Sequence, residues 1–92
     1  MKFENKVALI TGAYQGLGKG ISKKLGEQGC KIILVDIDEK VKDTEKEFTN
    51  IGIDSISVIG DVSKESTANL AIEKGVKKYS KIDILVNNAG IG

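Results

Sequence analysis

The sequence predicts an α/β fold, in which helices cover both faces of a parallel β-sheet. Short apolar runs recur along the chain without alternating polar residues, which is the pattern of strands that are buried on both faces. Segments with apolar residues at helical spacing separate these runs, so that strands and helices alternate. The chain has 92 residues, no proline and no linker rich in serine and glycine, and we therefore expect a single small domain.

Seven elements are expected in the order β-α-β-α-β-α-β. The four strands are expected at Val7–Thr11, Lys31–Asp36, 55–60 and 81–86, and the three helices at about 16–28, 39–50 and 64–80. Right-handed crossovers and a reversal after the third strand predict the spatial strand order 3-2-1-4. This arrangement is the first half of a three-layer, doubly wound parallel sheet of the Rossmann type.

The faces and ends of the helices also follow from the sequence. Apolar residues at helical spacing predict the buried faces: Leu17, Ile21 and Leu25 in the first helix, and Ala68, Leu70, Ala71, Ile72, Val76 and Tyr79 in the third. Gly29 and Gly52 are placed to end the first and second helices. Asp36 or Asp38 can cap the start of the second helix, and Ser63 can cap the third.

The composition excludes several functional classes. With 14 basic and 13 acidic residues the net charge is +1, which gives no electrostatic basis for binding nucleic acid. No apolar run approaches the ~18 residues of a membrane span, and the N-terminus has no apolar signal core. The single cysteine, Cys30, excludes an internal disulfide, so we expect a soluble, cytoplasmic protein. The chain has no histidine, which excludes histidine-based catalysis, and no metal site is expected.

A glycine-rich turn directly follows the first strand. Gly12, Gly16 and Gly18 lie between this apolar strand and the start of the first helix. A bound pyrophosphate requires a tight turn, close approach of the backbone, and a helix N-terminus with free N–H groups. The position of the glycines therefore favours nucleotide binding over an ordinary strand-to-helix turn that happens to contain glycine.

Asp36 ends the second strand and is the candidate ligand for a ribose. A carboxylate there can accept hydrogen bonds from both ribose hydroxyls of an adenosine, and its charge repels a 2′-phosphate. The alternative is a helix cap, since Glu39 follows three residues later as in a capping box. A Lys or Arg at position 14, 15 or 37 could bind a 2′-phosphate, but these positions hold Tyr14, Gln15 and Ile37. The sequence therefore predicts NAD in preference to NADP.

Three motifs resemble those of the short-chain dehydrogenase/reductase family. The segment Thr11-Gly12-Ala13-Tyr14-Gln15-Gly16-Leu17-Gly18 is similar to the TGxxxGxG signature of that family. Asp61-Val62 resembles the dipeptide after the family's third strand, and Asn87-Asn88-Ala89-Gly90 resembles the NNAG after its fourth. The motifs occur in the family's order and spacing from Lys6 onward. The resemblance implies that residues 1–92 are the N-terminal, NAD(P)-binding half of an oxidoreductase.

The resemblance also implies the positions of the cofactor contacts. The expected cofactor-binding residues are Gly12, Tyr14, Gln15, Gly16, Leu17, Gly18, Asp36, Ile37, Asp61, Val62, Asn88, Ala89 and Gly90. By this resemblance Asp61 meets the adenine amino group and Val62 covers the ring. Asn88, Ala89 and Gly90 lie along the adenosine ribose and its neighbours, and Asn87 helps to hold the central strands together.

The catalytic residues of the family have no counterpart in this sequence. Its members use a Tyr-x-x-x-Lys pair preceded by a serine, all beyond the NNAG motif. Tyr14 and Tyr79 are followed four residues later by Gly18 and Asp83, so neither forms such a pair. No catalytic residue is expected within the chain.

Two functional hypotheses follow. In the first, the chain is the adenine- and pyrophosphate-binding part of an NAD-dependent oxidoreductase, which transfers a hydride between nicotinamide and a small carbonyl or alcohol substrate, and it is inactive alone. In the second, it is a non-catalytic NAD-binding or nucleotide-sensing half-domain. That half-domain would act by self-association as a homo-oligomer, because the fourth strand forms an exposed sheet edge.

Overall fold

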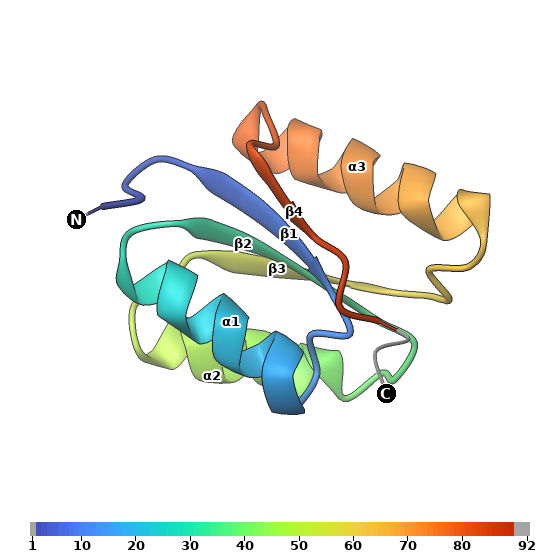
Figure 1. Ribbon diagram of the computed structural model, residues 1–92, viewed down its shortest axis with the longest axis horizontal. Helices are drawn as coiled ribbons and strands as arrows, with labels where there is room; N and C mark the ends of the chain where they lie inside the picture. Colours follow the sequence, from blue (N-terminus) through green and yellow to red (C-terminus); the bar gives the residue numbers. More distant parts are fainter. Residues whose placement is uncertain (1, 90–92) are drawn as a thin grey trace.

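Three helices surround a four-stranded parallel sheet in the computed structural model, which describes residues 2–89 (Figure 1). The elements are β1 (Val7–Thr11), α1 (Gly16–Glu27), β2 (Lys31–Asp36), α2 (Val41–Asn50), β3 (Ser55–Ile59), α3 (Glu65–Tyr79) and β4 (Ile84–Val86). The strand order is β3-β2-β1-β4, and every neighbouring pair is parallel. Helices α1 and α2 cover one face, and α3 covers the other (Figure 1). The predicted fold class and strand order are confirmed.

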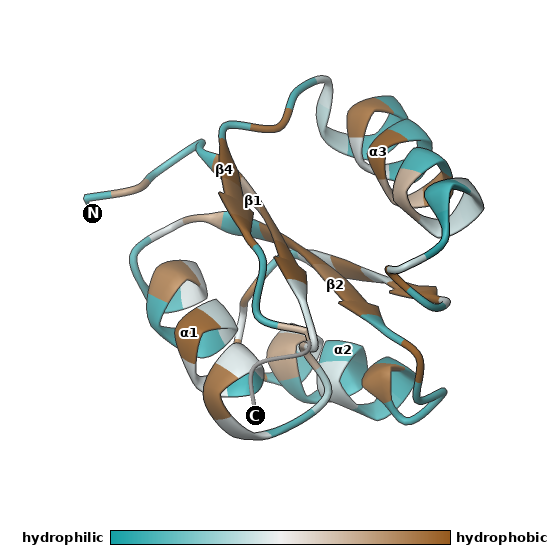
Figure 2. Cartoon of the chain, turned by 45° about the vertical axis from the view of Figure 1, so that its right-hand side comes forward, coloured by the Kyte–Doolittle hydropathy of each residue, from teal (hydrophilic) through white to brown (hydrophobic). Residues whose placement is uncertain are grey.

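The two central strands are buried on both faces. Ala8 and Ile10 of β1 pack with Phe48 of α2 on one side of the sheet. Val7 and Leu9, the alternate residues of β1, pack on the other side among the residues that α3 covers. Figure 2 shows hydrophobic residues along most of β1, β2 and β4. Burial on both faces explains why these strands are continuous apolar runs.

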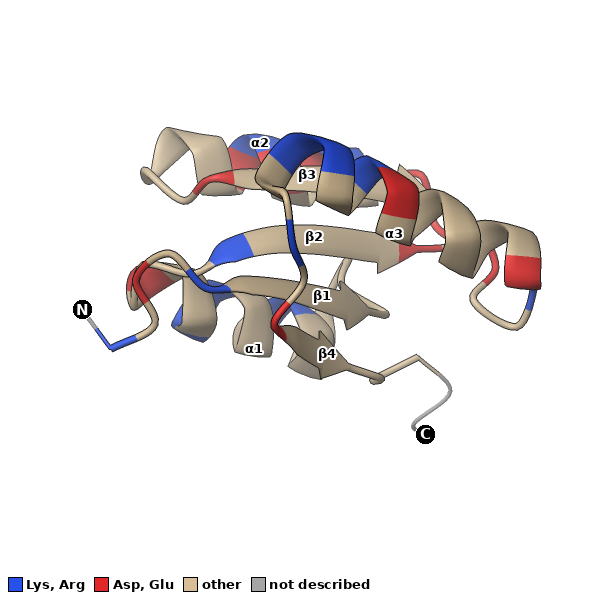
Figure 3. Cartoon of the chain, turned by 90° about the horizontal axis from the view of Figure 1, so that it is seen from above, with Lys and Arg blue, Asp and Glu red and all other residues tan. Residues whose placement is uncertain are grey.

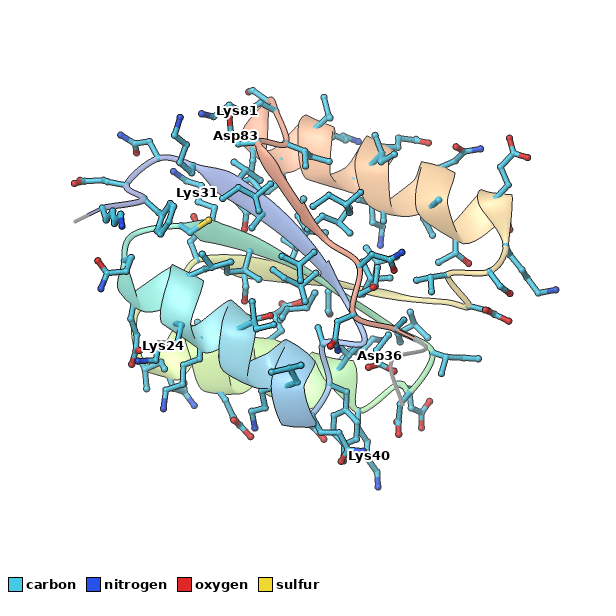
Figure 4. The ribbon with its side chains drawn as sticks, viewed as in Figure 1. Lys24, Lys31, Asp36, Lys40, Lys81 and Asp83 are labelled. Carbon is cyan, nitrogen blue, oxygen red and sulfur yellow. The ribbon has the colours of Figure 1, made fainter. Side chains whose placement is uncertain are left out.

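The fourth strand begins three residues later than predicted. Lys81 and Asp83 lie before it, at the amino ends of the strands, and their side chains form an ion pair of 3.0 Å (Figure 4). The Asp83 carboxylate also accepts a hydrogen bond of 2.9 Å from the N–H of Val7. This bond, and then the Lys81 ammonium, hold the pKa of the Asp83 carboxyl below its usual range. Asp83 therefore joins the start of β1 to the loop before β4 instead of extending the strand.

Two predicted helix caps are wrong. The Ser63 hydroxyl donates to Asp61 at 2.7 Å, while α3 begins two residues later with Lys64 at its N-cap and no side-chain cap among the described residues. Helix α2 begins at Val41 rather than at residue 39, because a turn held by Asp38, which accepts the Lys40 N–H at 2.9 Å, precedes it. The predicted helix ends at Gly29 and Gly52 agree with the structure to within two residues.

The buried face of α3 agrees with the prediction at Ala71 and Tyr79 but not at the other predicted positions. The helix packs through Thr67, Ala71, Gly75 and Tyr79, which recur every four residues. Gly75 lies so close to the Ile33 side chain that a Cβ at this position would collide with it. Three of the large apolar residues expected in the core, Leu70, Ile72 and Val76, are instead exposed. The same is true of Leu17 on α1, which is 63% exposed.

An apolar groove lies between α3 and β4. Its lining residues are Leu9, Thr11, Val35, Val62, Ala68, Ala71, Ile72, Val76, Ile82, Leu85 and Asn87, and its volume is about 490 Å³. Leu85 of β4 is 68% exposed at this groove. Helix α3 contacts β1, β2 and β3 most extensively, so its side toward β4 is left uncovered within residues 2–89.

Tyr79 joins the end of α3 to the start of β3. Its phenol donates a hydrogen bond of 2.9 Å to the carboxylate of Asp54, the residue before β3. Burial, and then this hydrogen bond, raise the pKa of the Tyr79 phenol far above its usual range. The neutral phenol is thus the form that the folded state favours.

We expect Tyr79→Phe to lower the free energy of unfolding at neutral pH by about 1 kcal/mol, the net value of one hydrogen bond. The parent chain should also lose stability above about pH 10, where the unfolded tyrosine ionises and the folded one does not. Tyr79→Phe should lack this tyrosine-dependent alkaline loss. Urea unfolding from about pH 7 to pH 11 measures both effects. Tyr14→Phe is the control and should retain the alkaline loss; equal pH profiles for the two variants would contradict the assignment.

Candidate functional site

A cavity lies at the carboxyl ends of the strands. It has a volume of about 440 Å³ and is lined by Gly12, Asp36, Ile37, Gly60, Asp61, Val62, Ser63, Asn87 and Ala89. These residues follow all four strands, which the parallel sheet brings to one edge. The strand order reverses between β1 and β4, and ligands of open α/β sheets bind at such a reversal.

The turn between β1 and α1 requires its glycines. Gly12 and Gly16 adopt φ values of +65° and +61°, which other residues rarely tolerate. Gly18 lies against the end of β1, and a Cβ there would collide with the carbonyl oxygen of Gly12. The predicted tight turn and close helix–strand packing are therefore present in the structure.

The N-terminus of α1 opens beside this turn. The helix begins at Gly16, its first turn contains no acidic residue, and Gln15 makes no side-chain cap bond with any described residue. The first N–H groups of a helix lack partners within the helix, and together they form the positive end of its dipole. A phosphate can accept hydrogen bonds from them without displacing a protein side chain.

Asp36 is held at the cavity wall by two backbone groups. One carboxylate oxygen accepts the Tyr14 N–H at 2.9 Å, and the other accepts the Asp38 N–H at 2.9 Å. Asp36 does not cap α2, because the N-cap of that helix is Lys40. Each carboxylate oxygen has a further lone pair. The carboxylate is thus oriented and can still accept hydrogen bonds from a diol.

The charges around the strand ends differ from those on α3. In Figure 3, Lys residues gather on the C-terminal half of α3, away from the acidic end of β2. In Figure 4, the Lys40 side chain extends outward, away from Asp36. None of the described residues lining the cavity is Lys or Arg. No cation among these described lining residues could therefore pair with an additional phosphate beside Asp36.

Asp61 and Val62, which follow β3, line the same cavity as Asp36. One oxygen of the Asp61 carboxylate accepts two hydrogen bonds from Ser63, at 2.7 Å from the hydroxyl and 2.9 Å from the N–H. These two bonds hold the pKa of the Asp61 carboxyl below its usual range. Apolar Val62 and the exposed side chain of Ile37 line the same cavity. A flat aromatic ring with an amino group matches these surfaces chemically.

Thr11 connects the segment after β4 to the end of β1. Its hydroxyl accepts the N–H groups of Asn88 at 2.9 Å and Ala89 at 3.0 Å, and it donates to the Asn87 side chain at 3.2 Å. The Asn88 amide donates to the Gly12 carbonyl at 3.3 Å. Thr11 is the first residue of the glycine-rich motif, but the sequence alone predicts no role for it. A hydroxyl at the last position of a central strand is the signal that could have indicated one.

The structure brings most of the predicted site residues together. Gly12, Asp36, Ile37, Asp61, Val62 and Ala89 line the cavity. Asn88 contacts Gly12 beside it, while Tyr14, Gln15, Gly16, Leu17 and Gly18 form the adjoining turn and the start of α1 without lining the cavity. Gly90 lies outside the described residues. Within residues 2–89 no three His, Cys, Asp or Glu side chains are grouped as metal ligands, and no helix could cross a membrane.

Comparison with known proteins agrees with this geometry. A family model described as short chain dehydrogenase matches residues 6–92. The chain belongs to the short-chain dehydrogenase family. The 2-dehydro-3-deoxy-D-gluconate 5-dehydrogenase of Dickeya dadantii is 46% identical over 88 residues, which are 96% of this chain and 34% of the relative.

Two solved structures are also similar. The 3-ketoacyl-(acyl-carrier-protein) reductase from Brucella melitensis, complexed with NADH, is 44% identical with a TM-score of 0.89, over 98% of this chain and 36% of that one. A metagenomic short-chain oxidoreductase in complex with NADP is 32% identical with a TM-score of 0.89, over 100% of this chain and 42% of that one. The chain spans about a third of the length of the curated relatives it matches.

The close contact at Gly18 gives a testable difference between two glycines of α1. We expect Gly18→Ala to lower the free energy of unfolding by about 1–3 kcal/mol, because its Cβ would overpack against the Gly12 carbonyl. Gly20→Ala is the matched control: apart from its chain neighbours and the backbone of its own helix, no atom would lie within 4 Å of a Cβ added there. This variant should gain up to about 1 kcal/mol from helix propensity. Urea unfolding of both variants measures the difference. An unchanged free energy of unfolding in Gly18→Ala would show that the turn is less tightly packed than described.

Proposed function

We propose that this chain binds the ADP portion of NAD(H), as part of an NAD-dependent oxidoreductase of the short-chain dehydrogenase family. The observation that carries the proposal is the arrangement of Asp36. Its carboxylate is anchored to the glycine-rich turn and faces the cavity next to the N-terminus of α1. A diol acceptor and a phosphate-binding helix start are the two features that an adenosine with a pyrophosphate requires.

Each part of the ligand has a chemical counterpart. The pyrophosphate would bind the N–H groups at the start of α1, where the close packing of Gly18 leaves no side chain between backbone and ligand. The ribose hydroxyls would donate to Asp36. The adenine ring would lie between Ile37 and Val62, with its amino group donating to the second oxygen of Asp61. Bound NAD would supply the nicotinamide that accepts or releases a hydride.

The preference for NAD over NADP is the finer part of the proposal. One similar structure holds NADH and another holds NADP, so relatedness supports a nicotinamide dinucleotide in general. The preference rests on the Asp36 carboxylate and on the absence of Lys and Arg among the described lining residues of the cavity. A 2′-phosphate there would approach a carboxylate without a compensating cation.

We expect the double variant Asp36→Ser with Ile37→Arg to shift the ratio of NADH to NADPH affinity by about tenfold or more toward NADPH. The substitution removes the repelling carboxylate and adds a guanidinium that binds phosphate, a change of more than about 1.4 kcal/mol. Fluorescence titration of both nucleotides measures the ratio. Asp38→Ser, which removes the neighbouring carboxylate, is the control and should leave the ratio unchanged. An unchanged ratio in the double variant would show that Asp36 does not face the ribose.

The catalytic part of the proposal concerns a longer protein of the family, of which this chain would be one part. A tyrosine and lysine at Tyr-x-x-x-Lys spacing would move the proton in the reduction of a small carbonyl substrate, and the chain has no such pair. The 92-residue chain alone should therefore bind NADH weakly without oxidising it. Incubation with NADH and a small diketone, followed by absorbance, tests this; measurable turnover would contradict it.

A cytoplasmic location is part of the same proposal and is consistent with one buried free cysteine, Cys30.

A second candidate function is supported by the uncovered side of the sheet. Strand β4 has a strand neighbour on one side only within the described part of the chain, and Leu85, Ile72 and Val76 expose apolar surface beside it. Such edges and patches pair with other chains. The chain would then be a nucleotide-binding half-domain that self-associates.

We expect the 92-residue chain to form dimers or larger species in sedimentation experiments at high concentration, because association covers this surface. Leu85→Lys should reduce the associated fraction, since lysine at an edge opposes pairing. Ile51→Lys is the matched control: Ile51 is also exposed, at 55% compared with 68% for Leu85, but it lies at the end of α2 on the other face of the sheet. A stable monomer, or equal effects of the two variants, would count against self-association through β4.

A further inference from the structure

Thr44 of α2 is a buried polar residue that contacts the glycine-rich turn. It is only 1% exposed, and its hydroxyl donates a hydrogen bond of 2.9 Å to the carbonyl oxygen of Tyr14. We propose that Thr44 is a positioning residue, which fixes the turn in the conformation that binds the pyrophosphate. This inference rests on the proposed function and adds to it a residue outside the three family motifs.

Thr44 completes a set of bonds that end at Tyr14. The Ala13 N–H donates to the Val35 carbonyl at 3.1 Å, so the turn remains attached to β2 beyond the end of β1. The Tyr14 N–H donates to Asp36, and its carbonyl accepts from Thr44. Both backbone groups of Tyr14 are therefore used within the protein. The N–H groups available to a phosphate begin at the next residue, and their direction depends on how Tyr14 is held.

The geometry of Thr44 differs from that of an ordinary helical threonine. Thr49, five residues further along α2, donates its hydroxyl to the carbonyl of Glu45 four residues earlier, at 3.0 Å. This local bond is the usual way for a helical threonine to find a partner. Thr44 instead reaches out of its own helix to the turn. A local bond of the kind that Thr49 makes would also satisfy the buried Thr44 hydroxyl, so burial alone does not require the bond to the turn.

Helix α2 is a rigid support for this contact. Val41 and Phe48 are fully buried in the core on either side of Thr44. Glu47, three residues after Thr44, forms an ion pair of 2.7 Å with Lys19 in the first turns of α1. Residues three apart lie on the same side of a helix. The same face of α2 thus contacts the turn before α1 and the beginning of α1 itself.

The test compares ADP with adenosine, because only ADP carries the phosphates that would bind the N–H groups of the turn. Thr44→Val keeps the shape of the side chain but removes the donor, and it leaves the Tyr14 carbonyl without its partner. We expect the affinity for ADP to fall by about three- to tenfold, the range of one lost hydrogen bond, and the affinity for adenosine to change by less than about twofold. Thr44→Ser should restore ADP binding. Thr49→Val is the matched control and should affect neither ligand.

Hydrogen exchange of the Tyr14 amide tests the positioning role without a ligand. We expect faster exchange in Thr44→Val than in the parent chain or in Thr49→Val, with the free energy of global unfolding measured alongside. Unchanged ADP affinity and unchanged exchange would overturn the inference. So would an equal loss of ADP and adenosine affinity, which would mark a general structural role. If the parent chain bound neither ADP nor NADH, the proposed function would fail, and the exchange comparison would still decide whether Thr44 fixes the turn.

Discussion

The close contact between the start of α1 and the end of β1 determines the geometry of the candidate site. Gly18 lies against the Gly12 carbonyl, so the helix begins immediately beside the strand and its N-terminus opens at the edge of the sheet. A side chain at this position would separate the two elements and move the N–H groups away from the cavity. The position of the glycine-rich turn, the anchoring of Asp36 and the contact from α2 all depend on this short distance between α1 and β1.

The strand order then brings distant segments to the same place. Because β4 pairs with β1, Asn88 and Ala89 lie beside Thr11, more than 75 residues away in sequence, and their N–H groups share its hydroxyl. Because β2 pairs with β1 on the other side, Asp36 lies within hydrogen-bond distance of the turn. A small domain can therefore form a dinucleotide-type site from short segments, each placed by the sheet and not by its own loop.

Much of this arrangement could be predicted from the sequence, for physical reasons that differ by element. The bounds of β1 and β2 were predicted correctly, because strands buried on both faces must be continuous apolar runs. The exposure of Ile72 and Val76 could not be predicted, since helical spacing identifies an apolar face but not whether another element covers it. The Ser63 cap is wrong because α3 begins at Glu65 with Lys64 as its N-cap, one residue later than a cap at Ser63 requires, and the Ser63 hydroxyl donates to Asp61. The contacts of Thr11 and Thr44 depend on tertiary pairing, which residue type alone does not indicate.

The start of α1 is the proposed pyrophosphate-binding site. The most direct measurement is a titration of the isotopically labelled chain with ADP, followed by the chemical shifts of the backbone amides. We expect the largest changes at Gln15, Gly16, Leu17 and Gly18, with smaller changes around Asp36 and Asp61. No change at the glycine-rich turn, or changes confined to the lysine-lined surface of Lys74, Lys77 and Lys78 on α3, would contradict this assignment.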